Sequence, residues 1–238
     1  MTLKSSRQTN TAWLVVAVGA IAVLLSGCAS SGPTDNPIVR KFSWYSYLEG
    51  GDIRATCGSA AANQYRMVYN GVFTEQVRTY DISADGHLEV GVIEPAHLDH
   101  LSVSSLSDLL NPWRAKTANR MVSSAQVDDI ANALQHDGAF GAPAVGTELS
   151  SRGFYWTIAA CHQGQYHFTA LAWPSPAWDS ATFPDVLLAL DPSAIAVNPP
   201  RDTGPLRTTA RRSQGNFANE FHTKVGTNGL AGFTPILP

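Results

Sequence analysis

The sequence predicts an α+β domain in which an antiparallel sheet, built from two hairpin groups, packs against one or two helices. Three observations carry this prediction: three strand-like segments between residues 64 and 93, a capped amphipathic helix at residues 123–137, and a second hairpin between residues 153 and 173. Strands gathered in hairpins around a helix are typical of a sheet whose face is covered by helices. The predicted domain spans residues 42–190.

The chain begins with a segment typical of export. Lys4 and Arg7 precede an uncharged stretch whose apolar core, Ala12 to Leu25, is 14 residues long. A helix needs about 20 apolar residues to cross a bilayer, so this core is short for a membrane span and fits the core of a cleaved signal peptide. An uncleaved N-terminal helix is the alternative interpretation.

The export segment ends at Leu25-Ser26-Gly27-Cys28, which resembles the lipobox of bacterial lipoprotein precursors. The resemblance covers only this segment. It implies that lipoprotein signal peptidase cleaves between Gly27 and Cys28, and that Cys28 then carries two or three acyl chains of the palmitate kind. Such chains anchor a protein without crossing the bilayer. The alternative is an ordinary secretory signal with an incidental cysteine.

The address and charge of the mature chain follow from the same segment. Residue 29 is Ala rather than Asp, which implies the periplasmic face of the outer membrane if the organism has two membranes. Loss of Lys4 and Arg7 leaves 14 basic residues against 19 acidic ones, a net charge of about −5. Because no basic run is present, nucleic acid is not expected as a partner. Residues 28–41 are expected to form a flexible, lipidated tether.

A strand meander opens the domain. Segments 64–69 and 72–82 are rich in β-branched and aromatic residues, and Asn70-Gly71 between them predicts a tight hairpin turn because both positions accept positive φ. A second turn at residues 83–86 leads into an alternating strand at residues 87–93. Three antiparallel strands are expected in sequence.

One helix and a second hairpin complete the predicted core. Ser123 and Gln126 have the spacing of a capping box, and Gly138 supplies a stop, so residues 123–137 are predicted to be helical. Residues 153–161 and 166–173 then form a hairpin whose first strand is apolar on both faces, as in a central strand. Pro184 opens a short apolar helix over residues 183–190.

The end of the chain has a different composition. From Asp191 to Pro238, 11 of 48 residues are Pro or Gly, and the apolar residues have no regular period. This composition predicts a mostly disordered tail, for which binding to a partner is the suggested function.

Two cysteines follow Cys28, and both have a structural explanation. Cys57 and Cys161 are expected to form a disulfide, since an exported compartment is oxidising. The alternative is a nucleophile, with Cys161 beside His162, but neighbouring strand residues point to opposite faces. No catalytic residue is therefore assigned.

Metal ligands are also not assigned. His97 and His100 lie near one helical turn apart, yet without a second cluster of ligands. The run from Asp81 to Leu88 resembles the start of a calcium loop, but its twelfth position is Val92 rather than Glu. No cofactor is expected.

The last feature is an aromatic loop. Trp173, Pro174, Pro176 and Trp178 stand outside the predicted strands and are a possible ligand groove, with packing of the domain as the simpler explanation. The sequence thus predicts a membrane-anchored accessory or interaction module with an envelope protein or the cell wall as partner. The alternatives are a binder of a small ligand or cell-wall fragment through this loop, and a hydrolase with carboxylate or Cys/His chemistry.

Overall fold

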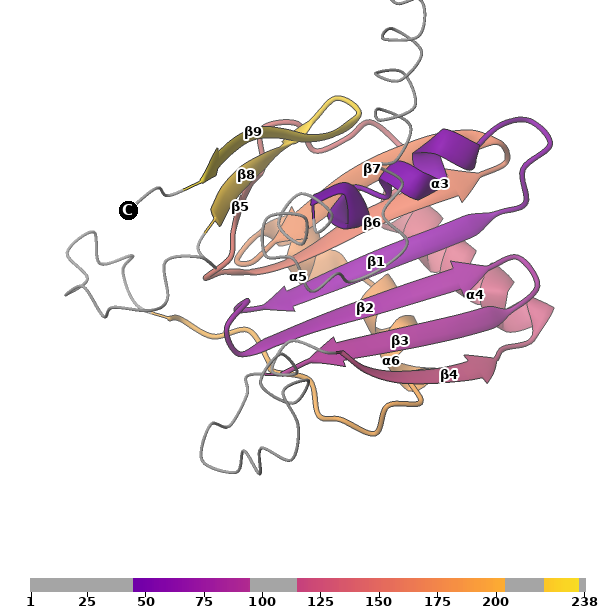
Figure 1. Ribbon diagram of the computed structural model, residues 1–238, viewed down its shortest axis with the longest axis horizontal. Helices are drawn as coiled ribbons and strands as arrows, with labels where there is room; N and C mark the ends of the chain where they lie inside the picture. Colours follow the sequence, from indigo (N-terminus) through magenta and orange to yellow (C-terminus); the bar gives the residue numbers. More distant parts are fainter. Residues whose placement is uncertain (1–44, 95–114, 204–220, 236–238) are drawn as a thin grey trace, which may run out of the picture. The chain divides into compact units, whose positions relative to one another are not determined.

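Six antiparallel strands form the main sheet of the computed structural model, which describes residues 45–94, 115–203 and 221–235. Their order across the sheet is β4-β3-β2-β1-β6-β7 (Figure 1). The strands are β1 (Gln64–Gly71), β2 (Gln76–Ser83), β3 (His87–Ile93), β4 (Lys116–Met121), β6 (Phe154–His162) and β7 (Gln165–Ala172). The two predicted hairpin groups meet where β1 pairs with β6, so the predicted α+β class is confirmed.

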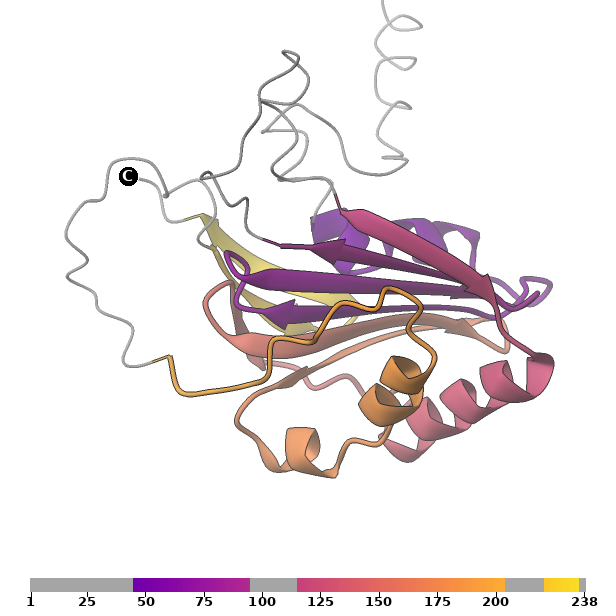
Figure 2. The ribbon, with the colours of Figure 1, turned by 90° about the horizontal axis from the view of Figure 1, so that it is seen from below.

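Helices cover one face of this sheet, which we call the helix face. They are α4 (Ser124–His136), α5 (Pro176–Ser180) and α6 (Phe183–Ala189), and Figure 2 shows all three on the same side of the strands. The predicted capping box of α4 is present, with Ser123 and Gln126 bonded to each other's backbone N–H. Apolar side chains from helices and sheet form one buried core here, including Ile130, Leu134, Leu187, Tyr65, Met67, Trp156 and Ile158.

The opposite face, which we call the α3 face, is covered by different elements. A helical turn at residues 45–48 and helix α3 (Gly51–Thr56) lie across it, in front of the main sheet in Figure 1. A small second sheet, in the order β5-β8-β9, packs there too. Its strands are β5 (Glu148–Ser150), β8 (Phe221–Gly226) and β9 (Gly229–Pro235). The core on this side includes Ile53, Leu149, Tyr155, Phe168 and Phe221.

Strand β6 serves both cores, as its sequence predicts. Trp156 and Ile158 point to the helix face, whereas Tyr155 and Ala159 point to the α3 face, and all four are buried. Both faces of an antiparallel strand are apolar only when both are covered. β6 therefore sits between two layers of cover.

The disulfide between Cys57 and Cys161 is present. It joins the residue after α3 to the end of β6, across 104 residues of sequence. The predicted pairing is confirmed. Since the bond crosses from α3 to the main sheet, it fastens the cover of the α3 face to the sheet beneath it.

The first hairpin exists, but its turn differs from the predicted one. Asn70 and Gly71 belong to β1 and pair with β2, and the turn is made by residues 72–75, where Val72 takes a φ of 61°. The reason is a tertiary contact: the Asn70 side-chain amide donates to the backbone oxygens of Ser151 and Gly153. These bonds hold Asn70 in the ladder and move the turn two residues onward.

The tail from residue 191 onward is predicted to be mostly disordered, but residues 191–203 are bonded to β2. Asp191 forms a buried ion pair with Arg78 of β2, and Arg78 also donates to the backbone oxygen of Ile195. The side chain of Gln76 accepts from the Asn198 backbone N–H at 2.9 Å and donates to the Ala196 backbone oxygen at 2.9 Å. The composition of this segment does not indicate its order, because its bonding partners lie on β2, more than 100 residues away.

The same prediction is wrong for residues 221–235, which form β8 and β9. β8 pairs with β5, and its apolar residues Phe221 and Val225 are buried against the α3 face. The alternation along Phe221, Thr223 and Val225 is short, and its cover comes from distant segments. The domain therefore extends beyond the boundary predicted at residue 190.

Candidate functional site

The predicted aromatic loop lies at one end of the helix face. Trp173 and Trp178 are partly buried, while Pro174 and Pro176 are exposed. The second half of the predicted loop is helical, because the Ser175 side chain caps α5 and Pro176 stands in its first turn. The Trp173–Pro174 peptide bond is cis.

Each tryptophan contacts a different aromatic residue of the sheet. The Trp173 ring meets Phe154 edge to face, with ring centroids 6.0 Å apart, and the Trp178 ring lies 6.3 Å from that of Tyr69. Phe154 and Tyr69 are buried. The two tryptophans thus form the outer layer of an aromatic stack that continues into the core.

A polar group borders this stack. The guanidinium of Arg201 lies 5.6 Å from the centroid of the Phe154 ring, and it pairs with Glu75 in the turn after β1. Arg201 also donates to Asn198 Oδ1 at 2.8 Å, while Asn198 Nδ2 donates to Glu75 at 2.8 Å. Burial raises the pKa of Glu75, but the hydrogen bonds and charge of Arg201, with the bond from Asn198, lower it by more.

The aromatic and polar parts are connected. Tyr69, which contacts Trp178, donates its hydroxyl to the backbone oxygen of Asn198. A continuous series of contacts therefore links Trp173 to Trp178 and runs in order through Phe154, Arg201, Asn198 and Tyr69. We name this candidate site the aromatic-arginine surface, and its residues are Glu75, Phe154, Trp173, Trp178, Asn198 and Arg201.

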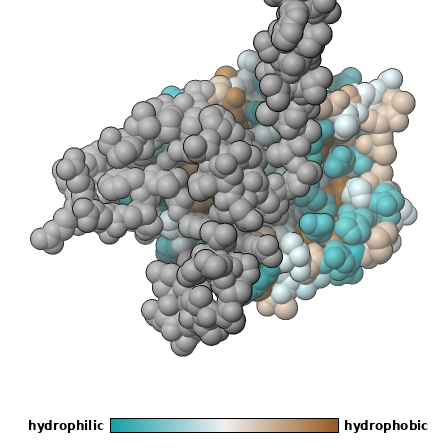
Figure 3. Space-filling model, viewed as in Figure 1, coloured by the Kyte–Doolittle hydropathy of each residue, from teal (hydrophilic) through white to brown (hydrophobic). Residues whose placement is uncertain are grey.

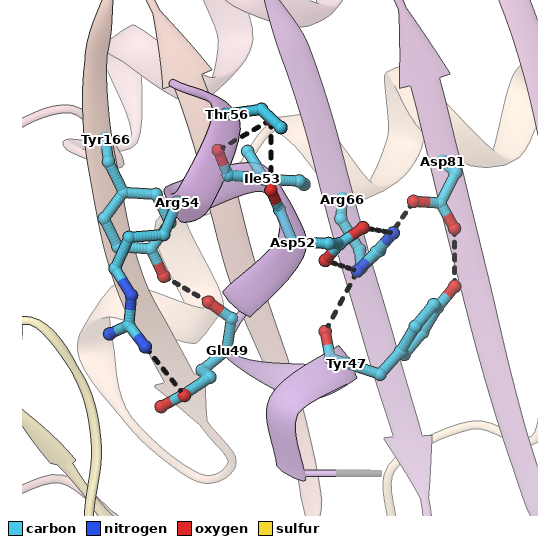
Figure 4. Close-up of polar contacts among 9 residues, drawn as sticks. All are labelled: Tyr47, Glu49, Asp52, Ile53, Arg54, Thr56, Arg66, Asp81 and Tyr166. Carbon is cyan, nitrogen blue, oxygen red and sulfur yellow. Dashed lines mark hydrogen bonds and ion pairs between the residues drawn. The ribbon is translucent and has the colours of Figure 1, made fainter. Parts of the chain in front are cut away.

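A second polar cluster lies on the α3 face (Figure 4). Arg66 of β1 donates to Asp81 at 2.6 Å and to both oxygens of Asp52 at 2.7 and 3.0 Å, and its guanidinium lies 3.9 Å from the centroid of the Tyr47 ring. Tyr47 donates its hydroxyl to Asp81. Burial raises the pKa of Asp52, but the hydrogen bonds and charge of Arg66 outweigh it and the net pKa is lowered. These contacts fasten α3 and the turn before it to β1 and β2.

Polar contacts also tie the C-terminal hairpin to this cover. Glu49 accepts from Arg54 at 3.1 Å and from the backbone N–H of Leu230, and Arg54 donates to the backbone oxygen of Asn228. Tyr166 of β7 donates to the Glu49 backbone oxygen (Figure 4). The bonds to Asn228, Leu230 and Tyr166 therefore join the cover of the α3 face to the C-terminal hairpin and to β7.

The exposed part of the α3 face is polar near the turn between β2 and β3. Figure 3 shows hydrophilic residues gathered at that end of the described surface, where Asp85, His87 and Glu89 are exposed. Asp85 accepts from the Ser83 hydroxyl and the His87 backbone N–H. The residues that resemble a calcium loop are thus a polar β-turn between two strands.

The ion pair of the helix face is the most enclosed ion pair among the described residues. Arg78 has 1% of its side chain exposed and Asp191 has 6%. Tyr80 donates to Asp191 at 2.7 Å, and Arg78 donates to Ser193 at 2.9 Å. Burial raises the pKa of Asp191, but the bonds from Ser193, Arg78 and Tyr80 lower it by more.

Histidines gather at the closed end of the second hairpin. The Phe140 ring stacks on His162 with centroids 4.1 Å apart, and the Tyr65 hydroxyl lies 2.9 Å from His162 Nδ1. His167 lies 5.4 Å from Phe140. Burial lowers the pKa of both histidines, and for His167 the neighbouring His162 lowers it further.

The residues considered for covalent or metal chemistry have other partners. Cys161 is bonded to Cys57, so its sulfur is oxidised and lies outside the reach of nucleophilic chemistry. The carboxylates of Glu75 and Asp81 are paired with Arg201 and Arg66. Within the described ranges, no group of three or more His, Cys, Asp or Glu side chains is placed to hold a metal ion.

Several predicted residues lie outside the described part of the chain. These are the signal segment 1–27 with Gly27, the lipidation site Cys28, the tether 28–41, and the pair His97 and His100. In the part that is described, no helix is long and apolar enough to cross a membrane.

The sequence indicates the tryptophans of the aromatic-arginine surface but not its polar half. Arg201 stands in the segment predicted to be disordered, and it pairs with Glu75, 126 residues earlier. An isolated arginine in a proline-rich segment gives no local signal of such a pairing. Comparison with protein-family models, with curated proteins and with solved structures finds no match to this chain.

Proposed function

We propose that this chain is an exported lipoprotein, held at a membrane surface by acyl chains on Cys28, whose folded domain serves as an interaction module. The proposed location is the periplasmic face of the outer membrane, if the organism has two membranes. The partner is an envelope protein or the cell wall.

One observation carries the proposal: the disulfide between Cys57 and Cys161. Disulfides persist in oxidising compartments outside the cytoplasm and are rare within it. A disulfide in the folded domain agrees with the lipobox-like segment ahead of it, although the two features are independent in the sequence. Together they support export followed by anchoring.

The interaction role rests on a contrast between the polar clusters that bond only within the fold and the more exposed aromatic-arginine surface. Arg66, Arg78 and Glu49 bond to neighbouring elements of the same fold, as do the carboxylates that face them. Such contacts stabilise a rigid body. The aromatic-arginine surface is different because two partly exposed tryptophans and a half-exposed ion pair stand together at its edge.

Intact-mass analysis of the native protein, purified from membranes in detergent, tests the anchor. We expect loss of residues 1–27 and an added diacylglyceryl mass, with the protein in the membrane fraction. The Cys28→Ser variant should lose both the added mass and the membrane association, whereas the Cys57→Ser/Cys161→Ser control should keep both. A retained Met1, or an unmodified thiol at Cys28, would refute the proposal.

A further inference from the structure

We propose that the aromatic-arginine surface binds an uncharged oligosaccharide chain. This inference deepens the proposed function, on which it rests, by naming the substrate class of the interaction module. Three properties of the surface support it: the aromatic faces, the mixture of hydrogen-bonding groups, and the absence of net charge among its six residues.

The aromatic faces of the surface are suited to a sugar ring. A sugar ring presents a flat patch of C–H groups on each side, and such a patch packs on the face of an aromatic ring. Trp173 and Trp178 are the outermost rings of the stack, and both are partly exposed. Behind them, Phe154 and Tyr69 are buried and fix the positions of the two indoles. The surface therefore offers rigid aromatic area at little cost in conformational entropy.

The polar groups match hydroxyls. A sugar hydroxyl both donates and accepts, so a site that selects it needs donors and acceptors side by side. Arg201 supplies N–H donors and Glu75 supplies carboxylate oxygens, and 46% and 40% of their side chains are exposed. Asn198 holds both in place through hydrogen bonds of 2.8 Å. Ordered polar groups beside an apolar wall are the usual composition of a small-ligand site.

The charge balance selects among ligands. Arg201 and Glu75 form an ion pair, so the six residues carry one positive and one negative charge. A balanced pair gives no net attraction for an anion or a cation. An anionic glycan or an acidic peptide would meet the Glu75 carboxylate, and a basic peptide would meet the Arg201 guanidinium. An uncharged sugar chain has neither conflict.

Calorimetric titration of the full native protein in detergent tests the inference. The probe is the β-1,4-linked hexamer of N-acetylglucosamine, with a hyaluronan hexasaccharide as the charged contrast and a proline-rich decapeptide as the peptide contrast. We expect the neutral hexamer to bind and the two contrasts to bind at least about 10-fold more weakly.

Matched variants locate the site. Trp173→Ala should weaken binding of the neutral hexamer about 10-fold or more, and Arg201→Ala about 3-fold to 10-fold. Thr74→Ala, an exposed residue of the same turn as Glu75, should change it less than about 2-fold. Because Trp173 is partly buried and its loss can perturb the fold, the exposed Arg201 provides the independent variant.

Three results would overturn the inference: no heat with the neutral hexamer, equal binding by the Arg201→Ala variant, or preference for the charged glycan or the peptide. The proposed function fails on different evidence, the mass and membrane fraction of the native protein. A lipidated protein that binds no sugar would therefore remove this inference alone.

Discussion

The main sheet buries one arginine on each face, and the two differ in how exposed their carboxylate partners are. Arg78 on the helix face and its partner Asp191 are almost fully enclosed, with 1% and 6% of their side chains exposed. Arg66 on the α3 face is 7% exposed, but its partners Asp52 and Asp81 are 55% and 26% exposed. The first pair is sealed, whereas the second opens to solvent on the carboxylate side.

This difference in exposure determines how much each ion pair contributes to the free energy of unfolding. Removing one partner of a sealed pair leaves a charge in a medium of low dielectric constant, which is costly. Removing an exposed partner lets water take its place, so the loss is small. Similar contacts in two regions of one sheet should therefore differ several-fold in their effect on the free energy of unfolding.

The largest effect is expected for Asp191→Ala. The substitution leaves Arg78 buried without its carboxylate and should lower the free energy of unfolding by about 3 to 5 kcal/mol, measured by urea denaturation. The Arg78→Met/Asp191→Leu double variant removes both charges and should recover most of that loss. A loss below about 1 kcal/mol in the single variant would show that the pair is not sealed.

A smaller effect is expected for Asp52→Ala on the α3 face. Arg66 keeps Asp81 at 2.6 Å, and water can replace the half-exposed Asp52 carboxylate. The loss in free energy of unfolding should be about 1 kcal/mol or less in the same urea assay. Glu89→Ala, at the exposed position paired with Asp81 on β3, is the control and should have a still smaller effect. Equal losses for Asp52→Ala and Asp191→Ala would show that the exposure of the partner does not determine the effect on stability.

The smallest effect is a pH dependence between pH 7.5 and 5.5 that comes from two histidines of the helix face. Burial lowers the folded-state pKa of His162 and His167 below the value of about 6.5 in the unfolded chain. Between these pKa values the unfolded chain binds more protons, so the free energy of unfolding falls as the pH drops below about 6.5. The surrounding titratable groups are Tyr65 and Asp128: burial, and then the charge of Asp128, raise the pKa of Tyr65 to about 12.

Urea midpoints at pH 7.5, 6.5 and 5.5 measure this effect. The midpoint should fall slightly between the first two values and further at the third. The His162→Gln/His167→Gln variant should show a smaller fall, because the groups responsible are gone. An undiminished fall in that variant would assign the acid sensitivity to other residues.

Local sequence signals predicted the parts of the fold that local contacts specify. The capping box at Ser123 and Gln126, the turn at residues 83–86 and the alternation of β3 all act within a few residues, and each appears in the structure. β6 was identified as a central strand because both of its faces are apolar. In these segments one short stretch contains both the signal and its cause.

The parts that sequence reasoning missed depend on distant partners. β4 is exposed at five of its six positions and has no apolar alternation, so only its pairing with β3 makes it a strand. The Asn70-Gly71 turn was misplaced because two backbone oxygens more than 80 residues away hold Asn70 in the ladder. Residues 191–203 and the Arg201 half of the candidate site follow the same rule, since β2 and the turn after β1 fix them.

The disulfide has a further consequence for the covalent connectivity of the chain. The bond spans Cys57 to Cys161, so a protease that cuts the backbone once between these positions leaves the two fragments in a single covalent molecule. The nicked protein would run near its original mass on a gel without reductant and as two bands with it. A break in this half of the polypeptide therefore does not release either fragment from the other.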